Sequence, residues 1–102
     1  MNPVRLKEIK VKLPIDIAAM ATNVEIVNMF TNKAMTKMEY YRTKCIEMEE
    51  KYGMDFFAFN QKVNEGEKEV FSEWDDLILW EGYYYGCKEW EKKYEDLKQC
   101  LK

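Results

Sequence analysis

The C-terminal stretch from Ser72 to Lys102 constrains the fold most, because it has the pattern of one uninterrupted helix. Ser72 followed by Asp75 is typical of a helix N-terminus, and no proline comes after it. A helix of about thirty residues is roughly 45 Å long. Eight of the fifteen aromatic residues, including every tryptophan, lie between Phe71 and Tyr94. Because the first half of this helix is apolar almost all round, we expect it to pack against more than one neighbour.

Three further helices are expected upstream. Thr22 begins a capping box, Gly53 is a typical residue after a helix end, and Asp55 is a typical N-cap. Proline at the first turn favours a short helix before them. The expected helices cover residues 14–20, 22–52 and 55–63. We expect a mainly α fold in which the second and last helices lie antiparallel, joined by the short third helix.

Residues 6–13 are the single strand candidate, because apolar and charged side chains alternate along them. Ile9, Val11 and Leu13 fall on one face. A lone strand leaves backbone groups unpaired on both edges, so we expect the same strand of a second copy to complete an antiparallel ribbon. The chain is therefore predicted to be a homodimer, with residues 1–21 as a dimerisation segment and residues 22–102 as a helical hairpin domain.

The net charge of −3 is unevenly distributed. Residues 1–52 hold nine Lys/Arg and seven Asp/Glu, whereas residues 53–102 hold seven and twelve. The N-terminal half is mildly basic and the C-terminal half is acidic, so the two halves suit different partners. No signal peptide or long apolar span is evident. The three cysteines are far apart and have no disulfide pattern, so we expect a reduced, cytoplasmic protein.

Little in the sequence suggests catalysis or a metal centre. There is no histidine, and the single serine, Ser72, is explained by the expected cap. A cysteine nucleophile needs a base such as histidine, and the cysteine spacings do not match zinc sites. The acidic residues Glu73, Asp75 and Asp76 are stabilised by the dipole at the start of the helix. We expect no enzyme activity, metal or cofactor.

Protein binding is the function that the last helix favours. Tryptophan and tyrosine are enriched at binding hot spots, and acidic neighbours favour a basic partner. We expect some of these side chains to form the core and others to contact a partner. The candidate partner-binding residues are Trp74, Asp75, Asp76, Trp80, Glu81, Tyr83, Tyr84 and Trp90.

Two alternatives remain open at this point. The order of strand, proline-started helix and capped helix resembles ribbon-helix-helix DNA-binding proteins, in which a ribbon enters the major groove. Lys10 and Lys12 would then contact DNA, although the first helix is shorter than in that family. The other alternative is a purely structural helical dimer.

A further resemblance lies in the C-terminal half. The segment Lys51-Tyr52-Gly53-Met54-Asp55-Phe56, with Glu73-Trp74-Asp75-Asp76-Leu77-Ile78-Leu79-Trp80-Glu81 some twenty residues later, carries it. It resembles small archaeal and bacterial proteins with the patterns KYGM-x-F and E-x-x-D-x-x-x-W-E, described mostly as uncharacterised proteins or as candidate antitoxins of two-gene toxin–antitoxin pairs. The resemblance implies a dimer whose C-terminal helices wrap a small, often basic, toxin and block its active site.

Overall fold

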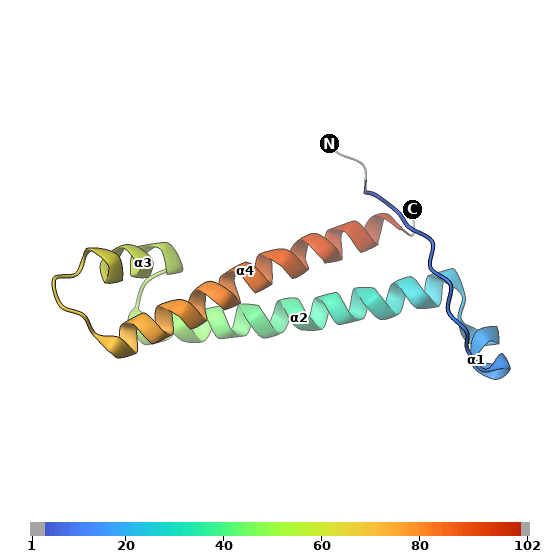
Figure 1. Cartoon of the computed structure of the whole chain (residues 1–102), viewed down its shortest axis with the longest axis horizontal. Coiled ribbons are helices and arrows are strands. Elements are labelled where there is room, and N and C mark those ends of the chain that lie inside the picture. Colours follow the sequence, from blue (N-terminus) through green and yellow to red (C-terminus); the bar gives the residue numbers. More distant parts are fainter. Residues whose placement is uncertain (1–3, 101–102) are drawn as a thin grey trace.

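The computed structural model describes residues 4–100, and these residues form four helices (Figure 1). The long helices α2 and α4 run antiparallel and side by side, as predicted, and α3 crosses between them at one end. We call that end the closed end and the opposite end, with α1, the open end. The bounds are α1 Ile15–Met20, α2 Asn23–Tyr52, α3 Phe56–Glu65 and α4 Phe71–Gln99.

Local capping signals explain where α2 and α3 begin and where α2 ends. The Thr22 hydroxyl accepts a hydrogen bond from the Glu25 backbone N–H at 3.1 Å. The Asp55 carboxylate does the same for the Ala58 N–H at 2.8 Å. Gly53 has a φ of 67°, in the left-handed region that glycine adopts without a steric penalty. The caps predicted at these residues are therefore confirmed, although α3 continues two residues beyond the predicted end.

The start of α4 differs from the prediction. Ser72 is not the N-cap; the helix begins at Phe71, and Val70 occupies the capping position without a side-chain hydrogen bond. The carbonyl of Val70 accepts hydrogen bonds from the backbone N–H groups of Glu73 and Trp74. The predicted last residues of this helix, 101 and 102, lie outside the described residues.

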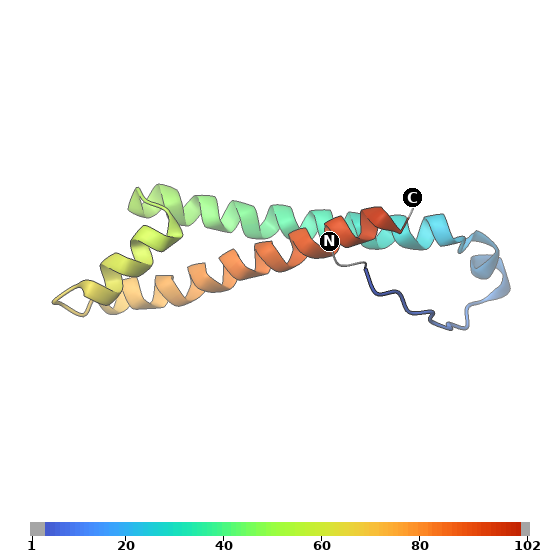
Figure 2. The same cartoon turned by 90° about the horizontal axis from the view of Figure 1, so that it is seen from above.

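The strand predicted over residues 6–13 is not present in the single chain. Residues 4–13 make no backbone hydrogen bond to another described segment, because no described strand lies beside them. The segment runs back from α1 toward the C-terminal end of α4 (Figure 2). A ribbon with a second copy therefore stays a prediction.

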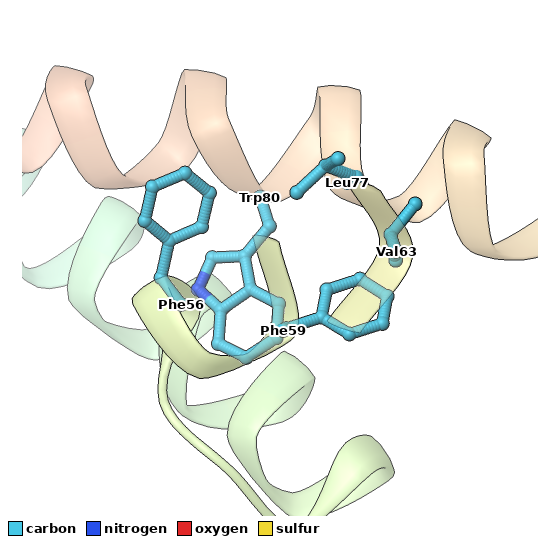
Figure 3. Close-up of a cluster of buried hydrophobic side chains, with 5 residues drawn as sticks. All are labelled: Phe56, Phe59, Val63, Leu77 and Trp80. Carbon is cyan, nitrogen blue, oxygen red and sulfur yellow. The ribbon is translucent and has the colours of Figure 1, made fainter. Parts of the chain in front are cut away.

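The core lies at the closed end, where α3 packs on the first half of α4 (Figure 3). The Trp80 indole lies between the rings of Phe56 and Phe59 and is only 1% exposed. Val63 and Leu77 complete this buried cluster. Further along the hairpin, the described buried apolar residues are Ala34 and Cys87 alone, so α2 and α4 share a thin interface toward the open end.

The molecule is long and thin for its size. Its principal extents are 62, 33 and 20 Å, and its radius of gyration is 19.3 Å, against about 13 Å for a compact domain of this length. Within residues 4–100, no helix is both long and apolar enough to span a membrane.

Candidate protein-binding surfaces

The outward face of the first half of α4 is largely apolar and exposed. Residues at helical spacing form it, and we call them the α4 outer stripe: Ile78, Leu79, Gly82 and Tyr85. Ile78 is 68% exposed and Tyr85 is 57% exposed. Their neighbours Leu77 and Trp80 point the other way, into the core. The helix is thus apolar on two faces, and its own chain covers one of them.

Gly82 makes the middle of this stripe flat. A Cβ atom added at Gly82 would meet no atom within 4 Å, so nothing in the chain requires glycine there. Glycine inside a helix costs about 1 kcal/mol relative to alanine. Gly86, one turn later, has an internal reason, because its Cβ would lie 3.0 Å from the Tyr41 ring. Gly82, for which packing within the chain gives no reason, is thus the glycine that faces solvent.

An exposed aromatic cluster borders the stripe on the side of α3. Phe57 is 58% exposed, and its ring centroid lies 5.2 Å from that of Tyr84. Tyr84 is also 5.2 Å from Tyr85 and stacks on the buried ring of Phe56 at 5.1 Å. The core therefore holds Tyr84 in place, and Tyr84 supports the more exposed rings of Phe57 and Tyr85.

The closed end is strongly acidic. Residues 47–81 hold eleven Asp/Glu and three lysines, a net charge of −8, whereas residues 4–46 hold eight Lys/Arg and four Asp/Glu, a net charge of +4. Within residues 4–100, Asp75 and Glu81 are exposed and form no ion pair. Their carboxylates are available to a basic partner.

Asp76 has an internal role instead. Its carboxylate accepts a hydrogen bond from Lys51 Nζ at 2.6 Å and another from the Tyr52 hydroxyl. The hydrogen bond from Lys51, followed by that from Tyr52, holds the pKa of Asp76 below its ordinary value. Burial and the hydrogen bond to Asp76 raise the pKa of Tyr52. This cluster joins the end of α2 to the start of α4.

The predicted partner-binding aromatics do not form one surface. Trp80, a predicted partner-binding residue, is instead buried in the core. Tyr83 is half-buried, with its ring centroid 6.5 Å from that of Tyr41, and Trp74 is half-buried against the core cluster. Trp90 is half-buried near the open end, where Lys93 lies over its ring. Of the predicted set, Asp75 and Glu81 border the outer stripe, and Tyr84 supports it.

Sequence reasoning did not include Phe57, Ile78 and Tyr85 among the candidate partner-binding residues. The helical spacing already places Ile78 and Tyr85 on the opposite side from Trp80. Because tryptophan is enriched at binding hot spots, the prediction favoured the face of the helix that carries Trp80. Only the position of α3, which covers the side that carries Trp80, shows which face is left uncovered.

The open end carries a groove of about 470 Å³ between the N-terminal segment and the ends of α2 and α4. Its apolar residues are Val4, Leu6, Phe30, Trp90, Leu97 and Cys100. Its charged residues are the cations Arg5, Lys7, Lys33 and Lys93 and a single acid, Asp96. Asp96 is already paired with Lys92 at 2.9 Å. The groove therefore combines an apolar floor with a surplus of positive charge.

The residues predicted for dimerisation and for DNA contact are all exposed at the open end. Ile9, Val11 and Leu13 have no apolar cover from the described chain, and Lys10 and Lys12 alternate with them. No described residue before Ala34 is buried. Because the segment is not in a ribbon here, the DNA-binding role stays a prediction.

The three cysteines differ in their exposure. Burial raises the pKa of both Cys45 and Cys87, which keeps these thiols protonated at neutral pH. Cys100 is exposed, and none of the three forms a disulfide. Within residues 4–100, no three His, Cys, Asp or Glu side chains are grouped so that they could hold a metal ion.

Comparison with protein-family models, with curated proteins and with solved structures gave no match.

Proposed function

We propose that this chain is a protein-binding module of the antitoxin type, which binds a small basic protein through the α4 outer stripe and blocks its active site sterically. The observation that carries the proposal is the exposed apolar face of α4 around Ile78, Gly82 and Tyr85 inside a strongly acidic end. Contiguous apolar surface of this kind, bordered by charges, marks interaction sites.

The composition of the surface fits a protein partner. Phe57 and Tyr85 are large, semi-rigid aromatic side chains, which bury much area at a small entropic cost. Ile78 and Leu79 continue the apolar area along the helix. Gly82 leaves room for a partner backbone to approach closely, which a longer side chain would prevent.

The charge distribution defines the class of partner. A net charge of −8 over residues 47–81 disfavours an acidic partner and attracts a basic one over long range. Asp75 and Glu81 border the apolar stripe, where they can pair with Lys or Arg at the rim of an interface. Steric occlusion needs no catalytic group on this chain, since a bound helix alone can cover another protein's active site.

The test is co-expression with the product of the neighbouring gene, because the two proteins of such pairs are encoded together. That product should be small and basic and should arrest growth when it is expressed alone. The wild-type chain should restore growth and co-purify with it. Ile78→Asp and Tyr85→Asp should weaken binding at least about tenfold, since losing a hot-spot contact costs about 2 kcal/mol or more.

Met29→Asp is the matched control, because Met29 is equally exposed but lies on α2 at the open end. This variant should still restore growth. A neighbouring product that is not toxic and does not bind would refute the antitoxin function. Equal rescue by Ile78→Asp and the wild type would show that the α4 outer stripe is not the binding surface.

A further inference from the structure

A second exposed apolar feature lies at the tip of the closed end, at the N-terminus of α4 and about two turns before Ile78 of the α4 outer stripe. We call residues 67–71, Glu-Lys-Glu-Val-Phe, the α4 tip. Phe71 is 78% exposed, the highest value among the exposed aromatic residues, and Val70 beside it is also exposed. Glu67 and Glu69 precede them and form no ion pair within residues 4–100.

The helix start holds Phe71 in this exposed place against the local preference of the chain. Ser72 would be a better N-cap than Val70, whose side chain cannot accept a hydrogen bond. Starting α4 at Phe71 fixes this residue on the first turn, where it contributes nothing to the core. A local rule that is broken without an internal benefit points to a functional contact.

The groove at the open end has the complementary chemistry. Its apolar lining includes Phe30, Trp90 and Leu97, and its volume is about 470 Å³. Arg5, Lys7 and Lys33 at its edge form no ion pair within the described part of the chain. In such a groove, the apolar residues can contact the ring of Phe71, and the cations can pair with the carboxylates of Glu67 and Glu69.

The tip and the groove cannot meet within one chain, because they lie at opposite ends of a molecule 62 Å long (Figure 1). We propose that the α4 tip of one copy inserts Phe71 into the open-end groove of a second copy. Two elongated copies that lie antiparallel bring the tip of each copy to the end at which the other copy carries its groove. The contact is then made twice about a twofold axis, which gives a closed dimer rather than a filament.

The surface area of the single chain is consistent with such a partner. The chain exposes 8615 Å², against roughly 6,100 Å² for a compact monomer of this mass. A standard protein interface buries about 800 Å² on each partner. The exposed area in excess of a compact monomer is large enough for two tip–groove contacts and for a further partner on the α4 outer stripe. This dimer therefore neither requires nor excludes the proposed function.

The first experiment measures the mass of the purified chain by sedimentation equilibrium over a range of concentrations and salt. We expect a dimer that weakens as salt is added, because ion pairs at the groove edge are screened. Phe71→Asp should raise the dimer dissociation constant at least about tenfold. Ile78→Asp is the control; it changes another strongly exposed apolar residue of α4, about two turns beyond Phe71, and should leave the dimer intact.

A charge exchange tests the geometry of the contact. Lys7→Glu with Lys33→Glu makes the groove acidic, and Glu67→Lys with Glu69→Lys makes the tip basic. Each doubly substituted chain should be monomeric alone, because tip and groove then carry the same sign. An equimolar mixture should form a one-to-one heterodimer, since each tip again faces a groove of opposite charge.

Three results would overturn the proposal. These are a monomer at every concentration at low salt, a dimer that Phe71→Asp leaves unchanged, and two charge variants that do not associate when mixed. Circular dichroism of every variant excludes loss of the helices as the cause. None of these results bears on binding at the α4 outer stripe, which Ile78→Asp tests separately.

Discussion

Asp76 shows how one carboxylate decides the arrangement of two helix ends. Lys51 and Tyr52 stand at the end of α2, and both donate hydrogen bonds to this residue near the start of α4. Asp75, its neighbour in sequence, is exposed and unpaired within residues 4–100. From sequence alone the two acids look equivalent, because both occupy the first turns of a helix. The difference depends on which of them points toward α2, and that is a tertiary property.

We expect Asp76→Asn to lower the free energy of unfolding by about 1–2 kcal/mol at neutral pH, because the variant loses charge-assisted hydrogen bonds. The pKa of Asp76 is lowered in the folded state, so its contribution is complete above the ordinary aspartate pKa of about 3.9. The contribution disappears as the pH falls through the lower folded-state pKa. Urea unfolding at neutral and acidic pH measures this difference.

Asp75→Asn is the control, and it should change the unfolding free energy little at either pH. If Asp75→Asn and Asp76→Asn were equally stable at neutral pH, the cluster of Lys51, Tyr52 and Asp76 would not be a stabilising link. If the wild type exceeded Asp76→Asn in unfolding free energy by the same amount at neutral and at acidic pH, this would contradict a lowered pKa of Asp76.

At the scale of elements, the helix ends show how far local sequence determines the fold. The predictions at Thr22, Gly53 and Asp55 are confirmed, because each cap depends on atoms within three or four residues. The predicted N-cap of α4 was wrong by two residues, and the strand at residues 6–13 is absent from the single chain. A strand needs a neighbour, and the described chain supplies none.

The two glycines of α4 test which face of this helix is free. Gly82→Ala should raise the free energy of unfolding by about 0.5–1 kcal/mol, because its Cβ enters open space and alanine favours the helix. Gly86→Ala should lower it by about 1 kcal/mol, since its Cβ crowds the Tyr41 ring at 3.0 Å. Thermal and urea unfolding of both variants measure the difference. Equal stabilisation by the two substitutions would contradict the close packing of α2 on α4.

At the scale of the molecule, the sequence predicted an antiparallel hairpin and a chain with two oppositely charged parts. It could not show that the core is confined to the closed end, because that depends on α3 folding back over Trp80. It also included Trp80 among the candidate partner-binding residues, since helical spacing alone does not reveal which of two apolar faces is covered. The uncovered face and the open-end groove became visible only with the positions of all four helices.

The shape of the dimer is the last prediction. Contacts between the tip of each copy and the groove of the other require the hairpins to lie antiparallel and side by side. The longest dimension in solution should therefore stay close to the 62 Å of one chain while the mass doubles. A ribbon formed by residues 6–13 of two copies would join the open ends instead, and the particle would approach twice that length. Small-angle X-ray scattering at low salt distinguishes the two arrangements, and an end-to-end particle would refute the tip–groove dimer in favour of the ribbon.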